Sequence, residues 1–180
     1  MMSNQSRIEQ ELKKKILVLD GAMGTMLQQA NLTAGDFGGE QYEGCNEYLN
    51  ITSPNTVTDI HLAYLEAGAD IIETNTFGGT PLVLNEYQLG EKAYEINKAA
   101  AQIAKQCAEQ FSTTEHPRFV AGSIGPTTKT LSITGGIDFD TLSAHFELQA
   151  TALIDGGCDV LLLETSQDML NVKAAYIGIL

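Results

Sequence analysis

The sequence has 180 residues, with 10 Lys and Arg against 23 Asp and Glu, which gives a formal net charge of −13. A chain this acidic does not attract phosphate backbones or anionic lipid, so we expect neither nucleic acid nor membrane as a partner. Hydrophobic residues make up 43% of the chain, enough for one packed domain and too many for a disordered segment. Three cysteines, an odd number, do not make a disulfide framework, so we expect a cytoplasmic protein.

The first half of the chain predicts a leading helix, a strand and a second helix. Ser6 and Glu9 have capping-box spacing, so residues 1–15 are interpreted as a leading helix. The apolar run 16–19 ends at Asp20 and predicts a strand that is buried on both faces. A short helix near 25–30 and a Gly-rich loop over 31–52 come next, and the loop's length marks it as a candidate functional segment.

The rest of the chain alternates helices and strands. Apolar spacing predicts helices over 54–67, 93–107, 142–153 and from 169 onward, and apolar runs predict strands over 70–74, 119–124 and 158–165. Strands that alternate with helices indicate parallel βαβ units. Glu73-Thr74 and Glu164-Thr165 end similar segments about 90 residues apart, which favours a repetitive barrel over a solenoid.

Carboxylates follow three of the four predicted strands, at Asp20, Glu73 and Glu164. In a barrel of parallel strands the active site lies at these carboxyl ends. Each acid alone is explained as a cap, but three at the same topological place suit an ammonium group or a hard metal ion. Strand side chains alternate, so Glu73 and Glu164 need not point the same way. Asp70 and Asp159, at strand beginnings, are assigned to turns and stability.

The cysteines and histidines predict no catalytic or metal centre of their own. Cys45 lies in a loop, Cys107 on the apolar stripe of a helix and Cys158 at the start of a strand, so they are not expected to converge on zinc. Cys107 and Cys158 are interpreted as small core residues, and the role of Cys45 stays open. None of the three histidines belongs to a metal-binding or nucleophile motif, so we expect them to be structural or exposed.

Four motifs at the predicted strand ends resemble the homocysteine S-methyltransferase family. They are Leu19–Thr25 (LDGAMGT), Ala69–Phe77 (ADIIETNTF), Val120–Thr127 (VAGSIGPT) and Leu162–Thr165 (LLET). Two further stretches, 45–54 and 168–175, look most like the cobalamin-dependent members of the family. The resemblance runs from about Ile16 to the last residue.

The resemblance implies a (β/α)8 TIM-barrel fold, of which residues 16–180 would form the N-terminal half, about the first four βα units. It implies homocysteine as substrate and zinc as the metal that binds its sulfur. In the cobalamin-dependent members, methylcobalamin gives the methyl group that converts homocysteine to methionine. Methyltetrahydrofolate regenerates methylcobalamin on another module.

The resemblance also implies which residues hold the substrate. Asp20 and Glu164 would bind the homocysteine amino group. The backbone of Gly21 and Ala22 and the side chains of Asn75, Thr76 and Ser123 would line the same pocket. The family's three zinc-binding cysteines have no counterpart here, so zinc ligands are expected beyond residue 180 and this chain has no predicted catalytic or metal residue. We therefore expect the intact protein to be an enzyme and this chain alone to be inactive.

Two alternatives stay open at this point. Within the family, the methyl donor can instead be betaine or S-methylmethionine. Outside it, the chain can be a non-catalytic half-barrel that binds an amino acid. In either case four parallel strands do not close a barrel, so the free edges predict self-association of the fragment.

Overall fold

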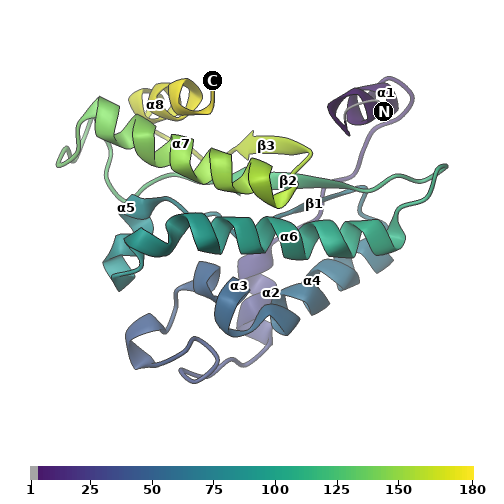
Figure 1. Cartoon of the computed structure of the whole chain (residues 1–180), viewed down its shortest axis with the longest axis horizontal. Coiled ribbons are helices and arrows are strands. Elements are labelled where there is room, and N and C mark those ends of the chain that lie inside the picture. The colour runs from purple at the N-terminus through teal and green to yellow at the C-terminus, as the bar shows by residue number, and fades with distance from the viewer. Residues whose placement is uncertain (1–3) are drawn as a thin grey trace.

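The computed structural model describes residues 4–180, which form a small parallel sheet covered by helices (Figure 1). The strands are β1 (Ile71–Glu73), β2 (Phe119–Ile124) and β3 (Val160–Leu163), in the spatial order β1-β2-β3. Both pairings are parallel, with Ile71 opposite Phe119 and Ala121 opposite Val160. The three predicted strands after the first are thus confirmed, although β1 and β3 are shorter than the predicted spans 70–74 and 158–165.

The helices match the apolar periodicity of the sequence. They are α1 (Asn4–Leu12), α2 (Met23–Gln29), α3 (Leu49–Thr52), α4 (Pro54–Glu66), α5 (Pro81–Leu84), α6 (Ala93–Phe111), α7 (Phe139–Gly156) and α8 (Met169–Ile179). Four single 3-10 turns are η1 (Glu40–Tyr42), η2 (Asn46–Tyr48), η3 (Asn85–Tyr87) and η4 (Gly90–Lys92). The stretch 31–52 is therefore only partly irregular, because η1, η2 and α3 lie within it.

The long helices form one layer against the sheet. In Figure 1, α8, α7, α6 and α4 follow one another from top to bottom, and adjacent members of this series pack together. One apolar cluster joins α7 and α8 to the sheet around Phe146 and Ile124, and another joins α4 and α6 to it around Leu65 and Val120. Burial of these apolar faces is the main stabilising contribution to the fold. Within the described residues no helix is long and apolar enough to cross a membrane.

The prediction of a buried strand over residues 16–19 is wrong. This segment forms a single parallel bridge between Leu19 and Ile71, and the side chains of Ile16 and Val18 are 90% and 57% exposed. The physical reason is that the segment bonds to β1 on one side only, through the Val18 carbonyl and the Asp20 amide. Within residues 4–180 no strand lies on its other side, so its apolar side chains are not covered.

Two buried aspartates fix the starts of the strands. Asp70 accepts hydrogen bonds from the Val18 amide, from Lys15 Nζ at 2.7 Å and from Arg118 Nη1 at 3.2 Å. Asp159 accepts from Lys105 Nζ and from the Val120 amide at 2.9 Å. Each carboxylate joins neighbouring segments of the sheet, in agreement with the structural role expected from the sequence.

Candidate functional site

A cavity of about 460 Å³ opens at the carboxyl ends of the strands. Its lining comes from the ends of β1, β2 and β3, the segment before α2, and η2. The lining residues are Asp20, Gly21, Ala22, Met23, Gly24, Asn46, Glu47, Glu73, Thr74, Asn75, Thr76, Phe77, Ser123 and Glu164. All seven substrate-binding residues predicted from the sequence are among them, and their role in binding stays a prediction. The cavity lies in the size range of small-molecule sites.

The three strand-end carboxylates all face this cavity. Asp20 is held in place because both of its carboxylate oxygens accept the Glu73 amide, at 3.0 and 3.1 Å. Burial is the main cause that raises the pKa of Asp20 to about 7; the nearby Glu73 and Glu164 carboxylates add to this rise, and the Glu73 amide opposes it. Burial and the charge of Glu164 likewise raise the pKa of Glu73 to about 7. The three acids therefore repel one another in a partly dehydrated space, and no Lys or Arg is among the lining residues.

Ser123 positions Glu164 through a short hydrogen bond. Its Oγ donates to Glu164 Oε1 at 2.6 Å, and its backbone amide donates to Thr74 Oγ1 at 3.0 Å. Thr76 Oγ1 donates to the Ser123 carbonyl at 2.7 Å and lies 2.6 Å from Thr74 Oγ1. Both threonine hydroxyls are hydrogen-bonded within the protein. Thr76 therefore forms part of the cavity wall, and its hydroxyl proton is already donated to the Ser123 carbonyl. The Glu164 side chain is thereby fixed from the neighbouring strand.

The backbone directly after Glu164 is in an uncommon conformation. Thr165 has φ +54°, in the left-handed region that β-branched residues rarely adopt. Backbone strain of this kind is found mostly at functional sites, where the surrounding structure holds it. The turn ends β3 abruptly and leaves Glu164 at the rim of the sheet, where it faces the cavity.

The loop between α2 and α4 supplies site residues that sequence reasoning missed. Asn75 Nδ2 donates to the Asn46 carbonyl at 2.7 Å, and Asn50 Nδ2 donates back to the Asn75 carbonyl at 2.8 Å. These bonds bring Glu47 to the cavity, where its Oε1 accepts the Gly78 amide at 2.7 Å. Burial raises the pKa of Glu47. Two signals in the sequence pointed to this loop, its length and the resemblance of residues 45–54 to the cobalamin-dependent family members, but neither singled out Glu47.

Other lining residues were also outside the predicted set. Glu73 was recognised as a strand-end acid, but strand alternation left its direction open, and the structure places it in the same cavity as Glu164. Met23, Gly24, Thr74 and Phe77 lie beside predicted residues along the chain. All four lie within the motifs Leu19–Thr25 and Ala69–Phe77, so these motifs were the signal that could have identified them.

The thiols of this chain do not fit a zinc site. Cys45 packs in a different apolar cluster from Cys107 and Cys158. Burial raises the pKa of Cys45 and of Cys158 to about 12, and it also raises the pKa of Cys107. Zinc binds thiolates that converge tetrahedrally, whereas these thiols are dispersed and held protonated. Across residues 4–180 no group of three His, Cys, Asp or Glu side chains is arranged to hold a metal ion.

Comparisons with known proteins agree on one family. The sequence profile of homocysteine S-methyltransferase matches residues 17–179. Methionine synthase from Mycobacterium leprae (strain TN) is 43% identical over 167 residues, which span 93% of this chain and 14% of that protein. This chain therefore corresponds to a small part of that relative's length.

Solved structures show the same fold. The metallated form of the homocysteine methyltransferase MmuM from Escherichia coli has a TM-score of 0.73 at 24% identity, over 91% of this chain and 58% of that one. Its apo form has a TM-score of 0.68 at 22% identity, over 93% and 56%. The chain thus spans somewhat more than half the length of these structures, and at this identity the likeness concerns the fold alone.

Proposed function

The chain belongs to the homocysteine S-methyltransferase family, and we propose that its strand-end cavity binds the amino-acid end of homocysteine. The observation that supports this most strongly is the set of three carboxylates, Asp20, Glu73 and Glu164, around a cavity with no Lys or Arg in its lining. An uncompensated acidic cavity favours a cation, and the ammonium group of an amino acid is the cation that this family's substrate offers. We also propose that the sheet is the first part of a (β/α)8 barrel.

Glu164 and Asp20 are the proposed ammonium ligands. Ser123 Oγ donates to Oε1 of Glu164 and Thr165 Oγ1 donates to its Oε2 at 3.4 Å, while Asp20 is oriented by the Glu73 amide. An ammonium group between them neutralises part of their mutual repulsion, so substrate binding lowers the pKa of Asp20 from its raised value. The fixed geometry means that little side-chain entropy is lost when the substrate binds.

The backbone near Gly21 and Ala22 is the proposed site for the substrate carboxylate. This segment precedes α2, whose first amide groups have no carbonyl partner within the helix. A carboxylate that accepts these amides would lie in the same cavity as the proposed ammonium ligands. The substrate sulfur would then point away from Glu164, toward the open side of the cavity.

In our proposal, the groups that activate the substrate sulfur and supply the methyl group are not provided by the residues of this chain. The dispersed, protonated thiols do not fit zinc, so we place the zinc ligands elsewhere in the intact protein and expect the chain alone to bind substrate without turnover. We propose methylcobalamin as the methyl donor, with methyltetrahydrofolate acting on another module, because the relative at 43% identity is a methionine synthase. The free cysteines suit the reducing cytoplasm, where we place the protein.

Isothermal titration calorimetry of the chain with L-homocysteine tests the proposal. We expect saturable binding that Glu164→Gln weakens about tenfold, because an ionic hydrogen bond contributes about 1.5–3 kcal/mol. Glu66→Gln, an exposed substitution at the end of α4, is the matched control and should leave the affinity unchanged. Equal affinity in wild type and Glu164→Gln would refute the assignment. Binding at full strength without any later turnover in the intact protein would favour a non-catalytic binding module.

A further inference from the structure

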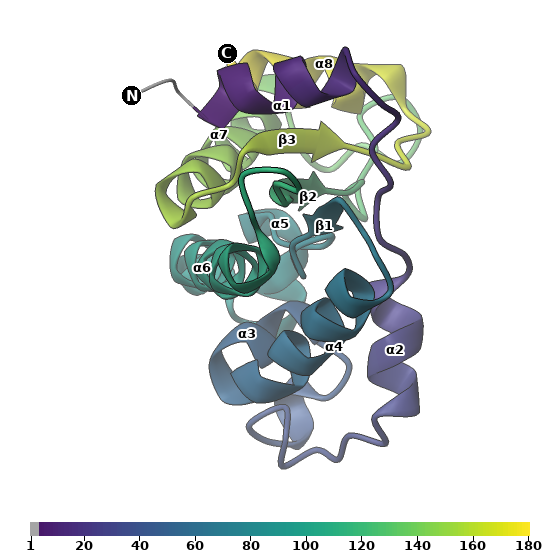
Figure 2. The same cartoon turned by 90° about the vertical axis from the view of Figure 1, so that its right-hand side faces the viewer.

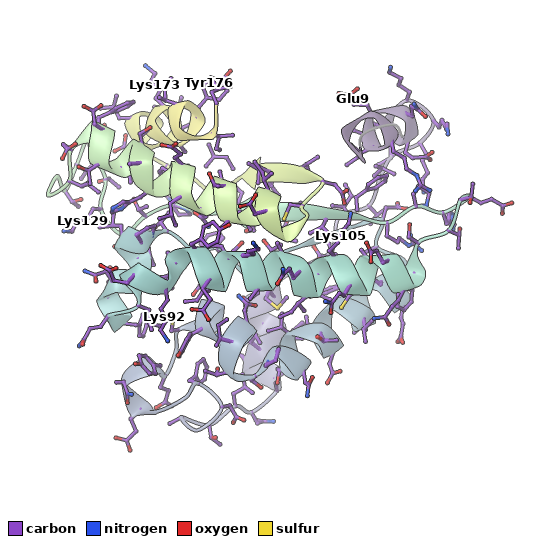
Figure 3. All side chains as sticks on the ribbon, viewed as in Figure 1. Glu9, Lys92, Lys105, Lys129, Lys173 and Tyr176 are labelled. Atoms are coloured by element: carbon purple, nitrogen blue, oxygen red, sulfur yellow. The ribbon has the colours of Figure 1, made fainter. Side chains whose placement is uncertain are left out.

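Cationic side chains gather at the opposite end of the sheet from the candidate site. A small cavity of about 150 Å³ lies where β2 and β3 begin, and Arg7, Lys105, Arg118, Ser112 and Asp159 are among its lining residues. The three cations come from α1, from α6 and from the residue before β2. Figures 1 and 2 show α1 at this end of the sheet. Figure 3 shows Lys105 on the side of α6 that faces the sheet.

Arg118 has one edge committed to the protein and one edge free. Its Nη1 donates to Asp70 Oδ1 at 3.2 Å, and its side chain is only 12% exposed. Its Nε is buried and has no hydrogen-bond partner among the described residues. A buried donor without a partner is destabilising, so an acceptor in the adjoining cavity would stabilise it. The Nε and Nη2 edge of a guanidinium group matches two oxygens of an oxyanion.

The charge around this cavity is positive, although the chain as a whole is strongly acidic. Lys105 is matched by Asp159, at 2.9 Å, and Lys15 and Arg118 share Asp70. Arg7 is bonded to a neutral acceptor, the Thr113 carbonyl, at 3.0 Å. The three lining cations exceed the two lining carboxylates, Asp159 and Glu109, by one charge, and Glu109 is exposed, as is Arg7.

We propose that this cavity binds a single phosphate-type oxyanion. At about 30 Å³ per water molecule, the cavity has room for roughly five waters, which suits one tetrahedral oxyanion and excludes a whole nucleotide. The Arg118 Nε and Nη2 edge would bind two of its oxygens, and Arg7 would close the mouth. Ser112 Oγ accepts the Arg118 amide at 3.1 Å, so its proton is available for a third oxygen.

The test uses the side-chain signals of the arginines in the full 180-residue chain. Arg7 and Arg118 are the only two arginines in the sequence, so a 15N-labelled sample gives two Nε–Hε signals. Inorganic phosphate should shift the Arg118 signal saturably at concentrations up to about 10 mM, which would saturate a site with a dissociation constant of about 1 mM. Sodium chloride at equal ionic strength should leave the signal in place.

Variants separate a binding site from a purely structural ion-pair network. Arg7→Gln, an exposed change, should weaken phosphate binding about tenfold, the usual loss for one ionic hydrogen bond. Lys173→Gln on α8 should have no effect, because Lys173 does not line the cavity and lies well away from the lining residue Lys105 in Figure 3. A second arm with adenosine monophosphate distinguishes the free anion from a phosphomonoester group, since only the species that binds shifts Arg118. An Arg118 signal that does not saturate with either ligand, or equal phosphate affinity in Arg7→Gln and Lys173→Gln, would overturn the proposal.

Discussion

His61 should make the protein sensitive to mild acid. It lies on α4 with 0% of its surface exposed, and neither ring nitrogen has a hydrogen-bond partner within the described residues. Burial lowers the pKa of His61 from 6.5 to about 4. The unfolded chain therefore binds a proton at His61 between about pH 6.5 and pH 4 that the folded chain does not bind, so stability falls as the pH decreases through this window.

The size of the effect follows from the shift. The pKa difference of 2.5 corresponds to about 3 kcal/mol once the pH is below both values, at about 1.4 kcal/mol per unit. At about pH 5 the loss is about 2 kcal/mol relative to neutral pH. His61→Leu places an apolar side chain of similar size at this position and removes the titrating group. Between neutral pH and about pH 5, the unfolding free energy of the variant should therefore fall by about 2 kcal/mol less than that of the wild type.

Urea unfolding followed by circular dichroism at about pH 7.5 and about pH 5 measures this difference. Other groups titrate over the same range, so the quantity of interest is the wild-type loss minus the variant loss. His116→Gln, at an exposed histidine, is the matched control and should behave as the wild type. Equal pH dependence in wild type and His61→Leu would mean that His61 is protonated or solvated in the folded protein, and the reasoning would fail.

Three further predictions concern the site, the loops around it and the sheet edges. Homocysteine binding should weaken below about pH 7, because the pKa values of Asp20 and Glu73 are raised to about 7 and both acids lose there the charge that attracts the ammonium group. The affinity should fall by at most about tenfold per pH unit for each of the two groups. A flat pH profile in calorimetry would contradict this. Gly79→Ala should destabilise the fold by about 1–3 kcal/mol in urea unfolding, since its Cβ would lie 2.7 Å from Gln149 Nε2 and 2.9 Å from the Thr76 carbonyl, whereas Gly24→Ala, with nothing within 4 Å, should not. The isolated chain should self-associate through the exposed apolar segment 16–19, and a monomeric mass in light scattering at micromolar concentration would exclude this.

Local sequence patterns predicted most of the fold, because in most strands and helices the apolar residues of the pattern are the residues that become buried. The run 119–124 is buried at every position, and the apolar positions of α6 face the core as their spacing indicated. The run 16–19 is equally apolar, but it does not form a buried strand. A strand needs hydrogen-bonded neighbours, and the segment from Ile16 to Leu19 has one, β1, through a single bridge.

The site was predictable to the extent that topology alone brings residues together. Asp20 and Glu164 directly follow the bridge at Leu19 and strand β3, and Ser123 lies near the end of β2, so their convergence needed only the strand order. Glu47 could not be found in this way, because its position depends on the bonds of Asn75 and Asn50 between two loops. The direction of Glu73 depends on where β1 ends, and a shift of one residue would have turned its side chain away from the cavity.

The claim that Glu164 binds an ammonium group is tested most directly by removing that group from the ligand. 4-Mercaptobutanoate has the thiol and the carboxylate of homocysteine but lacks its amino group. Calorimetry of both ligands with wild type and with Glu164→Gln gives a double-mutant cycle whose coupling term isolates the Glu164–ammonium interaction. The account predicts that Glu164→Gln weakens homocysteine about tenfold and leaves 4-mercaptobutanoate unchanged, a coupling of about 1.4 kcal/mol. An equal loss for both ligands would contradict it.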